Sequence, residues 1–299
     1  MARRGSRVRR STSEFSLRIA LAVVVAFVGY GSVARTLAQT LRTGDLARAH
    51  HLAPGDGRIT ALFASSVMTT DPGPASAQRA AQLARAALQQ DPTTVPALST
   101  LGLYAQTHGD AAAARGLFRY AEMLSRRDLQ VQLWAIENAV ARGDIANALT
   151  HYDIALRTSR SAWDLLVPVL GTAIADRPVR VALTRTLAAN PVWGSHFINY
   201  VVGEGTDPRT AAQLLGDMHR AHVPVSRPAQ AALVNKLATN GLIAEAWSYY
   251  ALVHTRADRN ASRDPDFGGD RVAPSLLDCM PVEYADIVTD IRTDGCNGV

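Results

Sequence analysis

Cysteine is scarce in this chain of 299 residues. Cys279 and Cys296 are its only cysteines, and both lie within the last 21 residues. A fold held together by several disulfides is excluded, because two thiols cannot supply such a framework. In an oxidising compartment the two cysteines would be able to close one disulfide loop in the C-terminal tail. A metal site would need further ligands at close spacing, and the sequence has none beside these cysteines.

Lysine is rarer still, and the excess of positive charge is confined to the N-terminus. Lys236 is the only lysine, and the abundance of arginine and alanine is typical of a GC-rich bacterial coding sequence. The formal net charge is +5, and residues 1–18 account for all of it. The six arginines of that segment, opposed only by Glu14, are Arg3, Arg4, Arg7, Arg9, Arg10 and Arg18. Nucleic-acid binding requires a basic stripe on the folded surface, so we expect no nucleic-acid partner.

Catalytic motifs are also missing. The sequence has no glycine-rich phosphate loop, no nucleophile elbow and no Ser-His-Asp order. Glu122, Glu137 and Glu245 fall in predicted helices without a partner carboxylate, so solvated helix faces explain them better than acid–base catalysis does. His219 and His222 are three residues apart and have the spacing to chelate a metal, but a position near a helix end suits histidine equally well. We expect no enzymatic activity and no cofactor.

The first long apolar run follows the N-terminal arginines directly. Residues 19–34 contain no charge, and with residues 15–17 the run reaches about twenty residues, the length of a membrane-spanning helix. We therefore predict a basic cytoplasmic segment over residues 1–14 and a transmembrane signal anchor over residues 15–34. The positive-inside rule then places everything after Arg35 in the periplasm, with a single pass through the bacterial inner membrane.

A cleaved signal peptide is the alternative to this anchor. The apolar run is short, and Ser32-Val33-Ala34 offers small residues at the spacing of a cleavage site. Leu37 and Leu41 continue the helical phase beyond that site, which favours the uncleaved anchor. Both alternatives export the same domain.

An internal repeat of 34 residues is the most informative feature that is present. Gly109, Ala114, Phe118 and Ala121 are followed 34 residues later by the same classes of residue in the same order. The second and third copies contain Gly143, Ala148, Tyr152, Ala155, Gly241, Ala246 and Tyr250. A fixed period of this length indicates one supersecondary unit that is copied along the chain and stacked on its neighbours.

Each copy has the pattern of two helices joined by a short turn. Leu98, Leu101 and Gly102 recur at helical spacing within residues 95–107, and a second amphipathic helix is predicted over 111–125. Gly109 and Gly143 provide the turns. We expect a bulky residue at Gly102 or Gly143 to find no room between the helices, and Phe118 to fill the space between one helix pair and the next.

These residues resemble the tetratricopeptide repeat family, whose pattern has Leu-Gly in the first helix, Gly at the turn, and Ala, an aromatic residue and Ala in the second helix. The resemblance implies an all-α fold, a right-handed superhelical solenoid of antiparallel helix pairs over residues 36–256. We expect six or seven such pairs and no strands. The remaining residues, 257–299, form a short irregular tail that either caps the array or is the remnant of a longer module.

The resemblance also implies a function on a surface. We expect a membrane-anchored scaffold whose groove holds a protein partner of the cell envelope. The first helices of the pairs supply the predicted lining residues: Ser99, Leu103, Gln106, Glu137, Asn138 and Asn235. Two alternatives remain open: an accessory subunit for polysaccharide synthesis or export, and the remnant of a larger protein whose catalytic or carbohydrate-binding module is missing.

Overall fold

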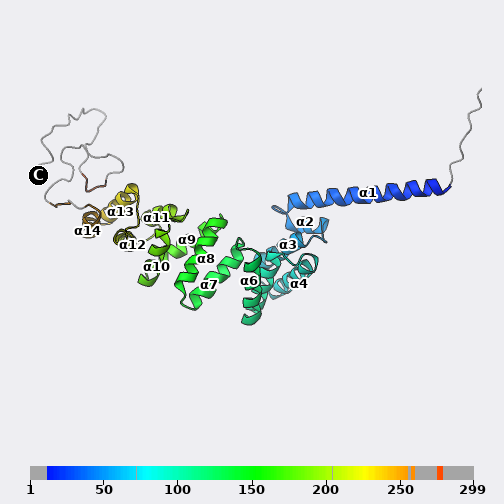
Figure 1. The fold of residues 1–299 in the computed structure, drawn as a ribbon, viewed down its shortest axis with the longest axis horizontal. Coiled ribbons are helices and arrows are strands. Elements are labelled where there is room, and N and C mark those ends of the chain that lie inside the picture. The colour runs from blue at the N-terminus through cyan, green and yellow to red at the C-terminus, as the bar shows by residue number, and fades with distance from the viewer. Residues whose placement is uncertain (1–11, 72, 204, 255–256, 260–274, 279–299) are drawn as a thin grey trace, which may run out of the picture. The chain divides into compact units, whose positions relative to one another are not determined.

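The computed structural model describes residues 12–71, 73–203, 205–254, 257–259 and 275–278. These residues form fourteen helices and no strand, which confirms the all-α prediction (Figure 1). The basic residues 1–11 and both cysteines lie outside the described residues. The chain divides into two compact units, Met1–Val131 and Gln132–Val299, and each is described by itself.

The helices of the first unit follow one another with short connections. They are α1 Thr12–Leu41, α2 Leu46–Leu52, α3 Gly57–Thr70, α4 Pro74–Gln90, α5 Val95–Thr107 and α6 Ala111–Leu124. Helix α7, Leu129–Ala141, begins at the end of this unit. The predicted pair over 95–107 and 111–125 is therefore confirmed as α5 and α6.

The second unit contains the remaining helices. They are α8 Ile145–Thr158, α9 Ala162–Ala173, α10 Arg177–Ala188, α11 Gly194–Val202, α12 Pro208–Arg220, α13 Arg227–Thr239 and α14 Ile243–Val253. Proline and glycine punctuation predicts helices near residues 193–202 and 208–221, which are α11 and α12, but it does not predict α10. The buried face of α10 is not wholly apolar, because it includes the polar residues Arg180 and Thr184.

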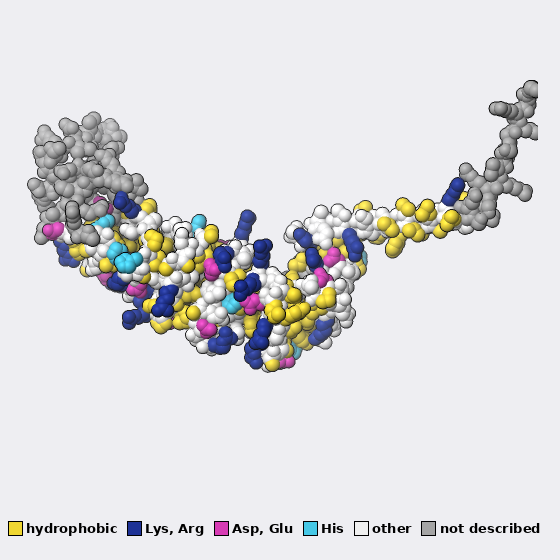
Figure 2. All heavy atoms as spheres, in the orientation of Figure 1, with side chains coloured by type: hydrophobic (Ala, Val, Ile, Leu, Met, Phe, Trp, Pro, Cys, Tyr) yellow, Lys and Arg dark blue, Asp and Glu magenta, His cyan; other side chains and the backbone are white. Residues whose placement is uncertain are grey.

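Helix α1 is long, apolar and almost entirely exposed. Residues Phe15–Leu41 are the one stretch among the described residues that is long and apolar enough to cross a membrane. Figure 2 shows its hydrophobic side chains lying open along the helix. Burial in a protein core therefore does not explain its composition, whereas a membrane anchor or a signal sequence does.

The C-terminal end of α1 belongs to the folded part of the first unit. Ala38 is buried in a small cluster with Ala49, Ala53 and Ile59 from α2, α3 and the segment between them. Helix α1 is thus continuous across the candidate cleavage site after Ala34, and it docks on α2 beyond that site.

Alanine forms the core between α3, α4 and α5. Their fully buried residues are Ala61, Ala64, Ala84, Ala87 and Ala97. Small side chains allow helix backbones to approach closely. In keeping with this, α3 packs on both α4 and α5, and α4 packs on α5.

Glycine turns with one geometry join the helices of three pairs. Gly109, Gly143 and Gly241 have φ values of +79°, +72° and +75°. At Gly109 the N–H groups of Gly109 and Asp110 donate to the carbonyls of Gln106 and Ala105 at 3.0 and 2.9 Å, and both other turns repeat this pattern. This is the Schellman arrangement that satisfies the last carbonyls of a helix. An acidic cap then begins the next helix in two of the three copies, where Asp110 and Asp144 accept a backbone N–H.

Two expectations about the first pairs need correction. Gly143 has open space around it, so the left-handed backbone, and not a lack of room, is what a larger residue would disturb there. A Cβ at Gly102, by contrast, would lie only 2.6 Å from the ring of Phe118. Phe118 therefore packs against Gly102 within its own helix pair, where we expected it between one pair and the next.

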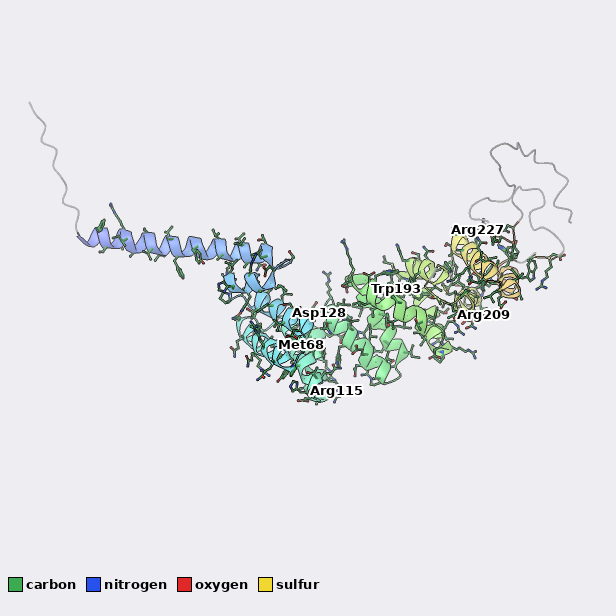
Figure 3. All side chains as sticks on the ribbon, turned by 180° about the vertical axis from the view of Figure 1, so that it is seen from behind. Met68, Arg115, Asp128, Trp193, Arg209 and Arg227 are labelled. Carbon is green, nitrogen blue, oxygen red and sulfur yellow. The ribbon has the colours of Figure 1, made fainter. Side chains whose placement is uncertain are left out.

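Large side chains form the core of the second unit, and its helices pack in two series. Helix α8 packs on α10, α10 on α12 and α12 on α14, while α9 packs on α11 and α11 on α13. The buried residues include Leu170, Leu183, Phe197, Leu214, Leu215, Met218, Leu233 and Leu237. The Trp193 indole N–H donates to Asp153 Oδ1 at 3.0 Å and connects α8 to the start of α11 (Figure 3).

Lys236, the only lysine, has a structural place in this unit. Its ammonium group on α13 donates to the carbonyl of Thr206 at 2.7 Å and to that of Gly203. These carbonyls lie at and just after the end of α11, where backbone oxygens have no partner within the helix. A flexible cationic side chain satisfies them and favours the helix dipole.

Candidate partner-binding surfaces

The predicted lining residues of α5 differ in their exposure. Gln106 is exposed and Leu103 is half-buried. Ser99 is buried, which differs from the expectation that it lines an open surface. Its hydroxyl donates to the carbonyl of Val95 at 3.1 Å and lies 3.4 Å from Asp128 Oδ1.

Asp128 explains why Ser99 is covered. Its carboxylate accepts the backbone N–H of Val131 at 3.1 Å at the start of α7, and Ser99 approaches the same oxygen from α5 (Figure 3). The hydroxyl therefore connects α5 to the beginning of α7. On α5, Leu103 and Gln106 remain as the accessible part of the predicted lining.

Aromatic and basic side chains also meet on the first unit, in contacts that no sequence motif predicted. The guanidinium of Arg79 lies 5.9 Å from the ring centre of Phe63, and that of Arg85 lies 5.7 Å from the ring centre of Tyr104. The ring of His50 stacks on Phe63 with their centres 5.1 Å apart. Cation–π contacts of this kind fix side chains on a helix surface. No fixed sequence spacing signals them, because each joins two or more helices.

The surroundings of His50 disfavour its protonated form. Burial, followed by the nearby positive charges of His51 and Arg79, lowers the pKa of His50 below its ordinary value. Its Nδ1 lies 3.2 Å from the hydroxyl of the buried Thr60. Helix α2 is therefore held against α3 most favourably when His50 is neutral.

The predicted lining residues of the second unit lie on α7 and α13. On α7, Glu137 is exposed and Asn138 is half-buried. On α13, Asn235 is half-buried, and its side-chain oxygen accepts the backbone N–H of Leu276 at 2.6 Å. A segment of the C-terminal tail thus already binds one of the residues that were predicted to meet a partner.

Ion pairs join three helices of the second unit. Arg209 on α12 lies 2.9 Å from Glu245 on α14 and lowers the pKa of that carboxyl group (Figure 3). Arg180 on α10 lies 2.9 Å from Asp217 on α12 and donates to the carbonyl of Ile174 at 3.0 Å. These charges have partners within the fold, and the pairs connect α12 to α10 and to α14.

The described residues contain no cluster of side chains typical of a metal site. Among those residues, no group of three or more His, Cys, Asp or Glu side chains is placed to hold a metal ion. His222 has a left-handed backbone with a φ of +55° just after α12, and it takes the position that glycine has in the other turns. His222 therefore helps to end α12, and the exposed His219 lies in the last turn of the same helix.

Comparison with known proteins does not identify a family for this chain. Neither a scan of the sequence against protein-family models nor a search of curated proteins gives a match. The resemblance to tetratricopeptide repeats therefore depends on the residues of the repeat.

Proposed function

We propose that the chain is a non-enzymatic scaffold that is anchored in the membrane and binds a protein partner through its paired helices. The observation that carries this proposal is the recurrence of one helix–glycine turn–helix geometry at Gly109, Gly143 and Gly241. Arrays of copied helix pairs present extended surfaces, and binding is their usual use. The proposal includes a right-handed superhelical solenoid, supported by the packing of α3 on α5 in the first unit and of alternate helices in the second unit.

The anchor in this proposal is α1. It exposes apolar side chains over Phe15–Leu41, and the N-terminal arginines favour a cytoplasmic start. In this arrangement the helix pairs lie in the periplasm. A reporter enzyme that is active only after export, fused after residue 254, should be active, and the intact mass of the mature protein should include residues 1–34. An inactive reporter would contradict the orientation, and loss of those residues would establish the signal-peptide alternative.

Leu103 and Gln106 are the positions proposed to meet the partner on the first unit. They combine an apolar side chain with an exposed amide, which suits an extended peptide or a helix held by packing and amide hydrogen bonds. Glu137 and Asn138 have the same mixed character on the second unit.

Affinity capture from detergent-solubilised membranes tests this surface. The double variant Leu103→Asp with Gln106→Ala should lose the captured partner while it keeps the helical content of the wild type. Arg115 is exposed on α6 and offers a matched control, Arg115→Ala, that should keep the partner (Figure 3). Equal capture by all three proteins would contradict the proposed surface. The identity of the partner would also separate general envelope scaffolding from polysaccharide synthesis or export.

A further inference from the structure

A short segment of the C-terminal tail contacts the last helix pair through Leu276 and Asp278. The backbone N–H of Leu276 donates to the side-chain oxygen of Asn235 on α13 at 2.6 Å. The hydroxyl of Tyr250 on α14 donates to Asp278 Oδ1 at 2.7 Å. Both helices of the pair thus bind the same short segment, Ser275–Asp278, across long separations in the sequence.

The segment is a turn that is closed by its own side chains. Asp278 Oδ2 accepts the backbone N–H and the hydroxyl of Ser275, each at 2.8 Å, and the N–H of Asp278 donates to the carbonyl of Ser275 at 3.0 Å. One carboxylate therefore both shapes the turn and binds Tyr250. Carboxylates that accept several hydrogen bonds at once are strong anchors.

The contacts have the chemistry of peptide recognition. An asparagine amide binds a backbone N–H, so it fixes the position of a chain without selecting its side chains. A tyrosine hydroxyl binds an acidic side chain, which adds selectivity. Tyr250 is only 2% exposed, and its ring lies 5.6 Å from Trp247 and 4.4 Å from His254, so neighbouring rings of α14 and its end pack around the side chain that binds the segment.

We propose that Ser275–Asp278 is an internal occupant of the surface formed by Asn235 and Tyr250, and that a partner peptide binds there by displacing it. The partner segment would carry the same chemistry: a serine or threonine followed three residues later by an acidic residue. This inference rests on the proposed scaffold function, because it names how one part of the binding surface is regulated. A tethered occupant competes at a high effective concentration, so it sets the affinity that a partner must exceed.

Peptide binding to the full-length protein in detergent tests the proposal. The probe is a fluorescent peptide of residues 272–281 with Cys279→Ser, and its anisotropy reports binding. In the Asp278→Ala protein the internal segment loses its anchor while the surface is intact. Tyr250→Phe, added to that variant, removes only the hydroxyl and keeps the packed ring. A second peptide that carries Asp278→Ala is the matched control for the probe.

The expected result is binding to the Asp278→Ala protein that is about tenfold tighter than binding to the wild type, since the tethered competitor is weakened. The added Tyr250→Phe change and the control peptide should each reverse that gain. Equal binding of the probe to the wild type and the Asp278→Ala protein, or no binding to either, would overturn the proposal.

Hydrogen exchange of the wild-type protein tests the contact between Leu276 and Asn235 independently. The amide of Leu276 should exchange more slowly than in the free peptide, and Asn235→Ala should remove that protection. Exchange of this amide at the rate of the free peptide in the wild type would also overturn the inference. Neither result affects partner capture through Leu103 and Gln106, so failure here is distinct from failure of the proposed function.

Discussion

The two units of the chain pack helices with different side chains. In the first unit the core of α3, α4 and α5 consists of alanine, and Ala61, Ala84 and Ala97 are fully buried there. In the second unit leucine, phenylalanine and methionine fill the same kind of space, as at Leu214 and Phe197. Alanine brings backbones close but buries little area per residue, whereas large side chains bury more area and hold helices further apart.

This difference determines how each unit should respond to mutation. A core of alanine has no room for added atoms, so enlargement is its weakness. A core of large side chains loses both buried area and contacts when a side chain is shortened, so truncation is its weakness. Enlargement in the first unit and truncation in the second test that contrast.

Leu214→Ala should be the most damaging change. Leu214 on α12 is fully buried, and its truncation should lower the free energy of unfolding by about 2–5 kcal/mol. Leu165 on α9 is 53% exposed, and Leu165→Ala should cost less than about 0.5 kcal/mol. Urea denaturation followed by circular dichroism measures both. Similar losses for the two variants would mean that the second unit has no packed core at α12.

Ala84→Leu tests the alanine core of the first unit. Ala84 on α4 is fully buried among other alanines, so three added carbon atoms should force α3 and α4 apart at a cost of about 1–3 kcal/mol. Ala75→Leu makes the same change at an exposed position of the same helix and should be nearly neutral. A neutral Ala84→Leu variant in thermal denaturation would show that these helices are not closely packed.

Gly143→Ala should cost about 1–2 kcal/mol, because its φ of +72° disfavours any residue with a Cβ. Contacts with other parts of the fold add nothing to this cost, since no atom beyond Gly143 and its chain neighbours lies within 4 Å of the added Cβ. Gly143→Asn should recover much of the loss, because asparagine tolerates this conformation better than alanine does. Thermal melting of the two variants measures the difference. Equal melting points for Ala and Asn would contradict the backbone explanation.

The pH dependence of the first unit should be the smallest effect. The pKa of His50 is lowered in the folded state, so the unfolded chain binds this proton more readily. The contribution of His50 to stability is therefore complete above its ordinary pKa of 6.5 and is lost as the pH falls below that value. Melting at about pH 5 and about pH 8 should show this loss, and His50→Gln should reduce it. An unchanged pH profile in His50→Gln would contradict this role.

The sequence predicted those features that depend on local pattern. The pair α5 and α6 is visible from Leu98, Gly109 and Phe118, because apolar spacing and a glycine turn are local signals. The apolar length of α1 is visible for the same reason.

The features that escaped prediction depend on tertiary contacts. Helix α10 buries Arg180, whose partners Asp217 and the Ile174 carbonyl become neighbours only after folding, so its inner face does not look apolar. Ser99 was expected on an open surface, and its approach to Asp128 covers it. The binding of Leu276 to Asn235 joins residues 41 positions apart, and no local pattern indicates it.

Photocrosslinking in living cells tests the central claim of a partner-binding scaffold most directly. A photoreactive amino acid in place of Gln106, which is exposed on α5, should give one discrete crosslinked protein. The same amino acid in place of Arg115, on α6, should give none above background. An identical background from both positions would contradict the proposal that α5 binds a protein partner.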